Sequence, residues 1–455
     1  MTGSDVAGAA PEVDESSVIR RMIWRLVPVV FVCYVFAYLD RVNISFAALT
    51  MNADLEITAT AYGWIAGIFF IGYFLFAVPA NVVLAKVGAR IWLSSLTVAF
   101  GVIGLLCAFV QDQMTLAVLR FLLGAAEAGV FPGIIVFLTL WFPARHRAKV
   151  LTAFIIAAPV SAALGGPLAG AILQLHDALG VAGWRWLFLV EGAPTVLLGL
   201  AMFGLLASGP RTARWLSAAE RRWLVTELET EAQAVEGTAG SMSTWRALIH
   251  PRVMVLCVAQ TCVVVAFYGF ALWLPQLLAR LTESTTAIGL LSALPFVLAV
   301  PTMILVARSS DRTGERSKHV AACYVLVAVG LLIAAVSGTS WWALVGLCLV
   351  AMGNFGAQPS FFALPPIFLT GARVAAAVAI ISSVSNLGGF LGPYMIGALK
   401  DVTGGFTVPL LVLACLGLVG TVTILATTRW SRPNATTEAP DTPTASSGDR
   451  EGSTR

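Results

Sequence analysis

Charged residues are the scarcest class in this chain. Only 11% of its 455 residues are Asp, Glu, Lys or Arg, whereas 58% are hydrophobic. Soluble globular proteins carry about 25% charged residues, so this composition excludes an ordinary water-soluble fold. The apolar residues form blocks of about 20, the length that a helix needs to cross a bilayer.

Histidine and cysteine are also few, and their positions suit neither metal binding nor catalysis. The seven cysteines lie inside apolar blocks without CxxC or metal-ligand spacing, which is typical of buried small hydrophobes. We therefore expect no cofactor and no metal, and the pattern argues against a membrane-embedded enzyme. A proton pathway would have to use carboxylates, because the four histidines fall in loops or at segment ends: His146, His176, His250 and His319.

The apolar blocks predict the fold class. Only helices or closed barrels satisfy the backbone in lipid, and these blocks are too long for barrel strands of about 10 residues. We predict an all-α integral membrane protein with transmembrane helices in twelve blocks: 26–47, 61–84, 91–110, 116–141, 150–173, 186–206, 253–278, 286–307, 320–337, 342–369, 374–399 and 405–427.

Two pairs of motifs indicate an internal duplication. The basic–x–Gly–x–Arg pattern of Lys86–Arg90 recurs at Arg312–Arg316, and Gly166-Pro167 recurs at Gly392-Pro393, both with an offset of 226. Secondary transporters often build a central site between such repeats. We expect two pseudo-symmetric six-helix bundles around a central cavity.

The longest polar break divides the blocks six and six. Within it, Ser217 followed by Glu220 predicts a capping box at the start of a short helix. The predicted organisation is a cytoplasmic N-terminal tail (1–25), a first bundle (26–206), a cytoplasmic central loop (207–252), a second bundle (253–428) and a disordered cytoplasmic tail (429–455), the last rich in Thr, Ser and Pro.

The distribution of basic residues predicts the topology. Of the 28 Lys and Arg residues, 23 fall on the side of the two tails and the central loop. The opposite loops hold only Arg185, Arg280 and Lys400. By the positive-inside rule both termini are cytoplasmic, in the inner (plasma) membrane. The net charge of +4 therefore reports topology and not nucleic-acid binding.

Four ionisable residues lie inside two of the apolar blocks: Asp40, Arg41, Arg120 and Glu127. A charge at this depth costs roughly 2.5–3.5 kcal/mol on insertion scales unless it is paired or faces water. Arg120 and Glu127 are seven residues apart and share a helix face, with Gly124 leaving space between them. One hypothesis is that Glu127 binds and releases a proton while Arg120 tunes it; the alternative is that both charges only lock the helix to a neighbour.

Asp40 and Arg41 are adjacent and point about 100° apart on a helix. We expect one to reach another helix while the other faces the cavity, where an Arg can grip a carboxylate with two hydrogen bonds. Alternatively, the first block ends near residue 40 and both residues are interfacial. The apolar run 42–51 argues against this alternative.

The second bundle carries no clear mid-membrane charge, so neutral groups would contact the solute there. The candidate substrate-binding residues are Tyr38, Arg41, Asn43 and Tyr73 in the first bundle and Tyr268, Asn354, Gln358, Ser382 and Asn386 in the second. Core packing is the alternative for each neutral residue. The candidate gating residues are Lys86, Gly88, Arg90, Asp311, Arg312, Gly314 and Arg316, which either anchor the cytoplasmic face or form an ion-pair latch between helices.

Five stretches together resemble the anion:cation symporter family of the major facilitator superfamily: Tyr38–Ile44, Arg120–Gly129, Gly183–Gly192, Ser310–Arg316 and Asn386–Pro393. The resemblance covers most of residues 20–430 and is nearest to the bacterial tartrate, phthalate and hydroxyphenylacetate permeases. It implies proton-coupled uptake of an organic anion by alternating access. It also implies that Arg41 contacts the substrate, Glu127 carries the coupling proton and Asp40 takes part in the proton network.

The expected function is thus secondary active symport of a small aromatic or hydroxylated carboxylate with a proton. The expected partners are that anion, the proton and the lipid bilayer, with a monomer as the functional unit. The alternatives are a facilitator or exporter of organic anions on the same fold, or a solute sensor that does not transport.

Overall fold

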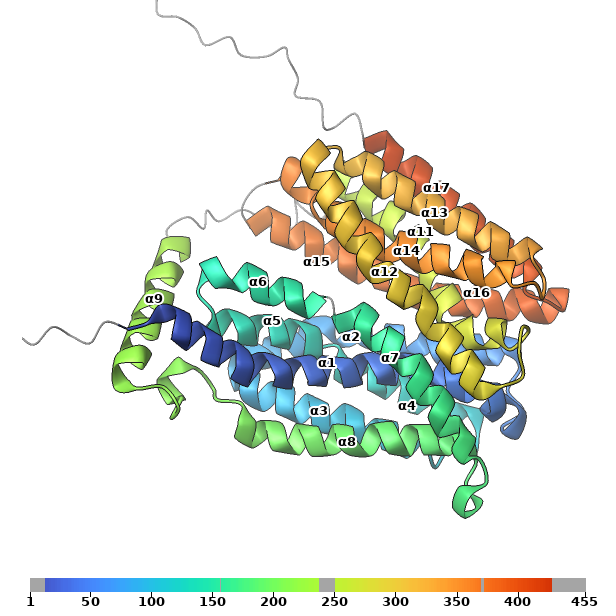
Figure 1. The fold of residues 1–455 in the computed structure, drawn as a ribbon, viewed down its shortest axis with the longest axis horizontal. Coiled ribbons are helices and arrows are strands. Elements are labelled where there is room, and N and C mark those ends of the chain that lie inside the picture. The colour runs from blue at the N-terminus through green and yellow to red at the C-terminus, as the bar shows by residue number, and fades with distance from the viewer. Residues whose placement is uncertain (1–12, 156, 237–249, 370–371, 428–455) are drawn as a thin grey trace, which may run out of the picture.

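The computed structural model describes residues 13–155, 157–236, 250–369 and 372–427 (Figure 1). Within these ranges all regular structure is helical, and twelve helical stretches are long and apolar enough to cross a membrane. The predicted fold class is confirmed. The predicted disordered tail, 429–455, lies outside the described residues.

The helices form two halves joined by the central loop. The first half contains α1 (Glu15–Asp54), α2 (Ala59–Val87), α3 (Ala89–Cys107), α4 (Gln113–Glu127), α5 (Val130–Trp141), α6 (Ala144–Ile155), α7 (Ala157–Ile172) and α8 (Gly183–Leu205). The loop contains α9 (Ala218–Glu236). The second half contains α11 (Pro251–Leu278), α12 (Thr285–Thr313), α13 (Arg316–Val336), α14 (Trp342–Phe362), α15 (Ala372–Asn386), α16 (Gly388–Thr403) and α17 (Thr407–Ala426). Short 3-10 turns are η1 (Leu173–Leu175), η2 (Ala178–Gly180), η3 (Pro210–Thr212) and η4 (Pro365–Ile367).

The first helix starts earlier than its hydropathy predicts. The Asp14 carboxylate accepts hydrogen bonds from the backbone N–H groups of Ser16 and Ser17, at 3.1 and 3.3 Å, so α1 begins at Glu15. Such a cap satisfies donors that have no partner within the helix. The expected N-terminal tail is therefore helical over residues 15–25.

Two predicted spans are interrupted. The fourth breaks after Glu127, and α5 begins at Val130 beyond the turn at Gly129. The eleventh breaks at Leu387, between α15 and α16. Hydropathy reports neither break, because both leave the segment apolar. The first break makes Glu127 the last residue of α4.

The N-terminal end of α4 is set by Asp112. Its carboxylate accepts hydrogen bonds from the hydroxyl and the backbone N–H of Thr115, at 2.6 and 2.8 Å. These bonds favour the charged form and lower the pKa of Asp112 below its ordinary value. This cap fixes the start of the helix that carries Arg120 and Glu127.

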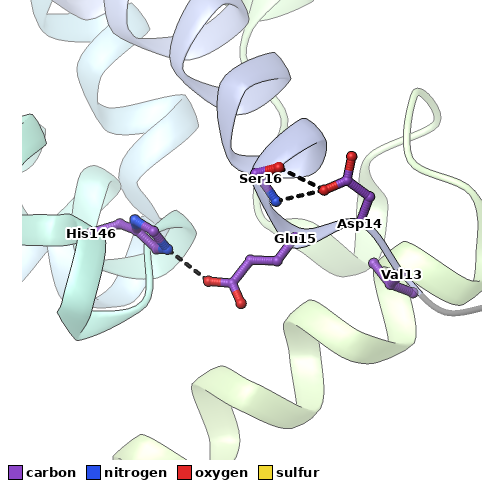
Figure 2. Close-up of a pocket in the computed structure, with 5 residues that line it drawn as sticks. All are labelled: Val13, Asp14, Glu15, Ser16 and His146. Carbon is purple, nitrogen blue, oxygen red and sulfur yellow. Dashed lines mark hydrogen bonds and ion pairs between the residues drawn. The ribbon is translucent and has the colours of Figure 1, made fainter.

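The central-loop helix α9 belongs to the first half. The predicted capping box is confirmed, since Ser217 N–H donates to Glu220 and Glu220 N–H donates to the Ser217 hydroxyl, at 2.9 and 3.2 Å. Arg145 of α6 pairs with Glu227 at 2.8 Å. Glu15, at the start of α1, lies 2.7 Å from the His146 ring on α6, and Figure 2 marks this contact with a dashed line. Exposed pairs of this kind contribute about 0–1 kcal/mol each, so they position α9 more than they stabilise it.

The two halves pack together at the end opposite the N-terminus of α1. There α7 crosses α12 and α2 lies against α16 (Figure 1), whereas at the other end the described parts of α6 and α15 do not pack against each other. The crossings rely on glycine: a β-carbon at Gly166 would lie 2.4 Å from the Gly289 carbonyl oxygen, and one at Gly63 would lie 2.3 Å from that of Pro393. Small residues allow helix backbones to approach closely in lipid.

Polar and aromatic contacts complete this closure, which we term the outer seal because the basic residues predict that this end faces away from the cytoplasm: Thr60, Tyr62, Trp273 and Asp401. The backbone N–H and hydroxyl of Thr60 donate to the Asp401 carboxylate at 2.7 and 2.6 Å. The Tyr62 hydroxyl donates to the Leu272 carbonyl at 2.6 Å, and its ring packs edge-on against Trp273. The seal therefore joins the start of α2 to α11 and α16 of the other half.

Gly124 gives the first testable prediction. A β-carbon there would lie 1.9 Å from the Phe69 carbonyl oxygen, so Gly124→Ala must push α4 away from α2. We expect it to destabilise the protein by about 1–3 kcal/mol, the usual cost of overpacking. Thermal unfolding of purified protein measures the effect. Gly204→Ala on α8, where a β-carbon meets nothing within 4 Å, is the control and should be neutral; equal melting temperatures for both variants would contradict the packing argument.

Candidate functional site

The four charged residues found in the sequence gather in one place with a fifth, Glu191 of α8. We term this set the buried charge cluster: Asp40, Arg41, Arg120, Glu127 and Glu191. Four of its members are 1–3% exposed, while the side chain of Arg41 is 15% exposed and is the most accessible. The helix α1 continues to Asp54, well beyond Asp40 and Arg41, which argues against the interfacial alternative.

Arg41 and Glu127 form a buried ion pair between α1 and α4. The guanidinium Nη2 lies 3.0 Å from Glu127 Oε2. Glu127 is the last residue of α4, and the C-terminal end of a helix repels a negative charge. The cation of Arg41 therefore supplies the main compensation for a carboxylate at this position.

Aromatic rings hold the Arg41 guanidinium in place. It lies 5.2 Å from the ring centre of Phe69 and 5.4 Å from that of Tyr73, both on α2. Among the described residues, Arg41 Nε and Glu127 Oε1 are buried without a hydrogen-bond partner. The Arg41 guanidinium is thus held in a fixed orientation and still has an N–H group that can donate a further hydrogen bond.

Arg120 contacts the backbone of α1. Its Nη1 and Nη2 donate to the backbone carbonyls of Asp40 and Arg41, at 2.9 and 3.1 Å, and its guanidinium lies 5.4 Å from the Phe69 ring. The hypothesis that Arg120 tunes Glu127 stays a prediction, and the ion-pair partner of Glu127 is Arg41. Seven residues span about 10.5 Å along a helix, so a shared face does not bring two charges into contact.

A second group of carboxylates lies on the other side of α1. The Asn43 side-chain amide donates to Asp40 Oδ1 and to Glu191 Oε2, both at 3.0 Å. Asn43 was expected beside the substrate but instead bridges these two acids between α1 and α8. Gly104 of α3 leaves room for them, since a β-carbon there would lie 2.9 Å from Asp40 Oδ2.

Glu191 was not among the predicted site residues. It lies within one of the family-like stretches, near the start of the block predicted at 186–206. In the structure α8 begins at Gly183 and Glu191 is 3% exposed. The signal was available, because an acid inside an apolar block is the same feature that identified Asp40.

The tyrosines flank the cluster from both halves. Tyr73 contacts Arg41, Tyr38 of α1 is buried, and Tyr268 of α11 packs against Phe70 of α2 with ring centres 4.4 Å apart. Through Phe70, which contacts Phe69, Tyr268 places the second half next to the aromatic rings that hold Arg41. The remaining candidates are Asn354 and Gln358 on α14 and Ser382 and Asn386 on α15, which stay predictions. The side-chain oxygen of Asn354, Oδ1, is buried and accepts no hydrogen bond within the described chain.

The predicted gating residues cap helices within each half. Arg90 donates to the Phe203 carbonyl at the end of α8 at 3.0 Å, and Arg316 donates to the Ala363 carbonyl after α14 at 2.7 Å. Gly88 and Gly314 adopt positive φ, +85° and +69°, at the preceding turns.

The expected ion-pair latch is therefore absent among the described residues in this conformation. Lys86, Asp311 and Arg312 are exposed, and none of them pairs with a neighbouring helix. The physical reason is that carbonyls at a helix C-terminus lack partners within the helix and attract a basic side chain.

The described residues contain no group of three or more His, Cys, Asp and Glu side chains that could hold a metal ion. The buried charge cluster, set in a twelve-helix membrane fold, is the arrangement of a solute carrier. Residues 30–393 match the Major Facilitator Superfamily, and the chain belongs to this family of membrane transporters. Family membership also sets aside the enzyme alternative.

Relatives place the chain more closely. It is 45% identical to a "Putative tartrate transporter" of Agrobacterium vitis, over 92% of this chain and 93% of that protein. It is 38% identical to a "Quinolone resistance transporter" of Acinetobacter baumannii, over 90% and 94%. Among solved structures, a D-xylose–proton symporter superposes with a TM-score of 0.70 at 16% identity, over 88% and 97%, which shows the fold alone.

Proposed function

We propose that this transporter takes up a small organic carboxylate together with a proton. The Arg41–Glu127 pair is the main support, because its cation is the accessible partner and its carboxylate the buried one. A solute carboxylate that binds Arg41 competes with Glu127 for the same guanidinium. Protonation of Glu127 removes that competition, so the anion and the proton favour each other's binding.

The charge balance of the buried charge cluster supports the same coupling. It holds two cations, Arg41 and Arg120, and three carboxyl groups, and Asp40 and Glu191 share the single donor Asn43. With all five ionised the cluster carries one uncompensated negative charge, and an uncompensated buried ion costs several kcal/mol. In the proposed cycle one carboxyl is protonated in the empty carrier, and a bound monoanion brings a second proton.

The arrangement of the halves suits a carrier that has turned inward. They close at the outer seal and stand apart at the end where α6 and α15 begin. The distribution of basic residues predicts that the separated end is cytoplasmic. In the proposed direction the solute enters past the outer seal and leaves at the cytoplasmic end of the inner membrane.

Two relatives favour different solutes. The relative named for tartrate supports a hydroxylated carboxylate. The relative named for quinolone resistance favours, as a second candidate, an exporter on the same fold. The two candidates differ in the direction in which the proton moves relative to the solute.

Purified protein in liposomes containing a pH-sensitive dye tests the proposal. Tartrate, phthalate, hydroxyphenylacetate and sugar acids are added outside, one at a time. We expect one of these acids to acidify the interior. Alkalinisation of the interior on the same additions would instead indicate proton antiport, the coupling expected of an exporter. Net uptake of labelled solute without any pH change would contradict proton coupling.

A further inference from the structure

A polar pocket lies on the far side of the outer seal from the buried charge cluster. It has a volume of about 490 Å³ and is bordered by the ends of α1 and α11, the start of α2, the end of α16 and the residue before α17. Its polar and aromatic lining consists of Asn52, Gln276, Arg280, Lys400 and Phe406. Both halves contribute, so the pocket exists only in their present relative position.

Two cations line this pocket, and no carboxylate does. The Arg280 guanidinium lies 5.8 Å from the Phe406 ring centre, and Lys400 Nζ lies 4.4 Å from it. Arg280 and Lys400 make no ion pair within the described chain. The neighbouring Asp401 is held by Thr60 in the outer seal and does not line the pocket.

The concentration of positive charge here is unusual for this face of the molecule. The sequence predicts three basic residues on this side, and two of them line one pocket. The third, Arg185, is occupied by the carbonyls of Ala108 and Val110, at 2.6 and 3.0 Å. The pocket thus holds the two basic side chains of this face that have no oxygen acceptor among the described residues.

We infer that this pocket is an outer binding site for a small carboxylate anion. Arg280 and Lys400 provide two charged donors, and the Gln276 side-chain amide lines the pocket beside them. A volume of this size falls in the range of about 300–1,000 Å³ that is typical of small-molecule sites. The identity of the anion as the transported solute rests on the proposed function; the anion site itself does not.

The pocket lies directly against the outer seal, on the predicted route of the solute. Lys400 Nζ lies 5.0 Å from the centre of the Trp273 ring, which contacts Tyr62, so the outer seal forms its floor. Asn52 is eleven residues beyond Arg41, about 16 Å along α1. An anion held here waits outside the closed seal and reaches Arg41 when the halves part at this end. Clefts of one charge sign raise the rate at which oppositely charged solutes arrive.

A cysteine probe in the full-length protein tests the site without requiring transport. Ala279 is exposed and lines the pocket, so Ala279→Cys can be treated with negatively and positively charged methanethiosulfonates of similar size. We expect the anionic reagent to react faster by about tenfold, as electrostatic focusing predicts. Arg280→Gln with Lys400→Gln should abolish the preference, whereas Arg280→Lys should keep it. Tartrate or phthalate should protect the introduced thiol with saturation.

Matched measurements decide the outcome. Leu179→Cys, which is exposed on the same predicted side, should show neither preference nor protection, and protein without the new cysteine corrects for native thiols. Protection that survives Arg41→Ala shows a site separate from the cluster, even if no proton movement is ever detected. Protection lost in Arg41→Ala, protection by phosphatidylglycerol vesicles alone, or no saturable protection would each overturn the inference.

Discussion

Arg41→Ala should reduce solute-driven acidification of liposomes to that of protein-free liposomes. The variant removes the accessible cation of the buried charge cluster, and Arg120, the other guanidinium beside Phe69, is held by the backbone carbonyls of α1. Solute-driven acidification by Arg41→Lys should also be slower than that of the unaltered protein, by about tenfold or more. Lysine keeps the charge but cannot donate two parallel hydrogen bonds to a carboxylate as the planar guanidinium does. A hydrogen bond to a charged group contributes about 1.5–3 kcal/mol, which is tenfold or more in affinity.

The control for this prediction comes from the same helix. Arg20→Ala removes an exposed cation near the start of α1 and should leave uptake unchanged. Size-exclusion and thermal unfolding would show that the Arg41 variants remain folded. Full uptake by folded Arg41→Ala would remove the central support for the proposed function.

Glu127→Gln should separate solute movement from the proton gradient. Glutamine keeps the shape of the protonated acid and cannot compete with the solute for Arg41, which now lies 3.0 Å from Glu127 Oε2. We expect exchange of labelled solute at equal pH to continue, while accumulation driven by an inward proton gradient falls to the equilibrium level. Solute affinity should also lose most of its pH dependence, because the competing anion is gone.

The two transport modes provide the internal control. Continued exchange shows that Glu127→Gln is folded and binds solute, and Glu283→Gln, which alters an exposed acid in the loop after α11, should behave like the unaltered protein. Unchanged gradient-driven accumulation in Glu127→Gln would transfer the coupling role to Asp40 or Glu191. The loss of both modes would mean that the carboxylate is needed for binding itself.

Hydropathy predicted the number and approximate position of the spans, because lipid requires each one to be long and apolar. It did not predict the breaks after Glu127 and at Leu387, since a change in backbone hydrogen bonding leaves composition untouched. It also placed the start of α1 too late. The Asp14 cap and the polar first turns lie outside the apolar run but still form helix.

The members of the site could be predicted more readily than their pairings. Charge inside an apolar block identified four of the five residues of the buried charge cluster. Which charge meets which depends on how α1, α4 and α8 are rotated and shifted, and periodicity within one helix does not contain that information. The Arg41–Glu127 ion pair was therefore not predicted, and Asn43 was assigned to the solute instead of to Asp40 and Glu191.

All five members of the buried charge cluster lie in the first half, and the second half brings the neutral side chain of Tyr268 against Phe70 beside it. In the proposed function, the anion on Arg41 and the proton on a carboxyl are thus separated from the predicted neutral contacts of the second half, which would distinguish one acid from another. Exchanging neutral residues on α11, α14 and α15 can retarget such a carrier without disturbing its coupling. An ancestral carrier of this design could acquire new solutes by altering one half alone, which suits relatives named for solutes as different as tartrate and quinolones.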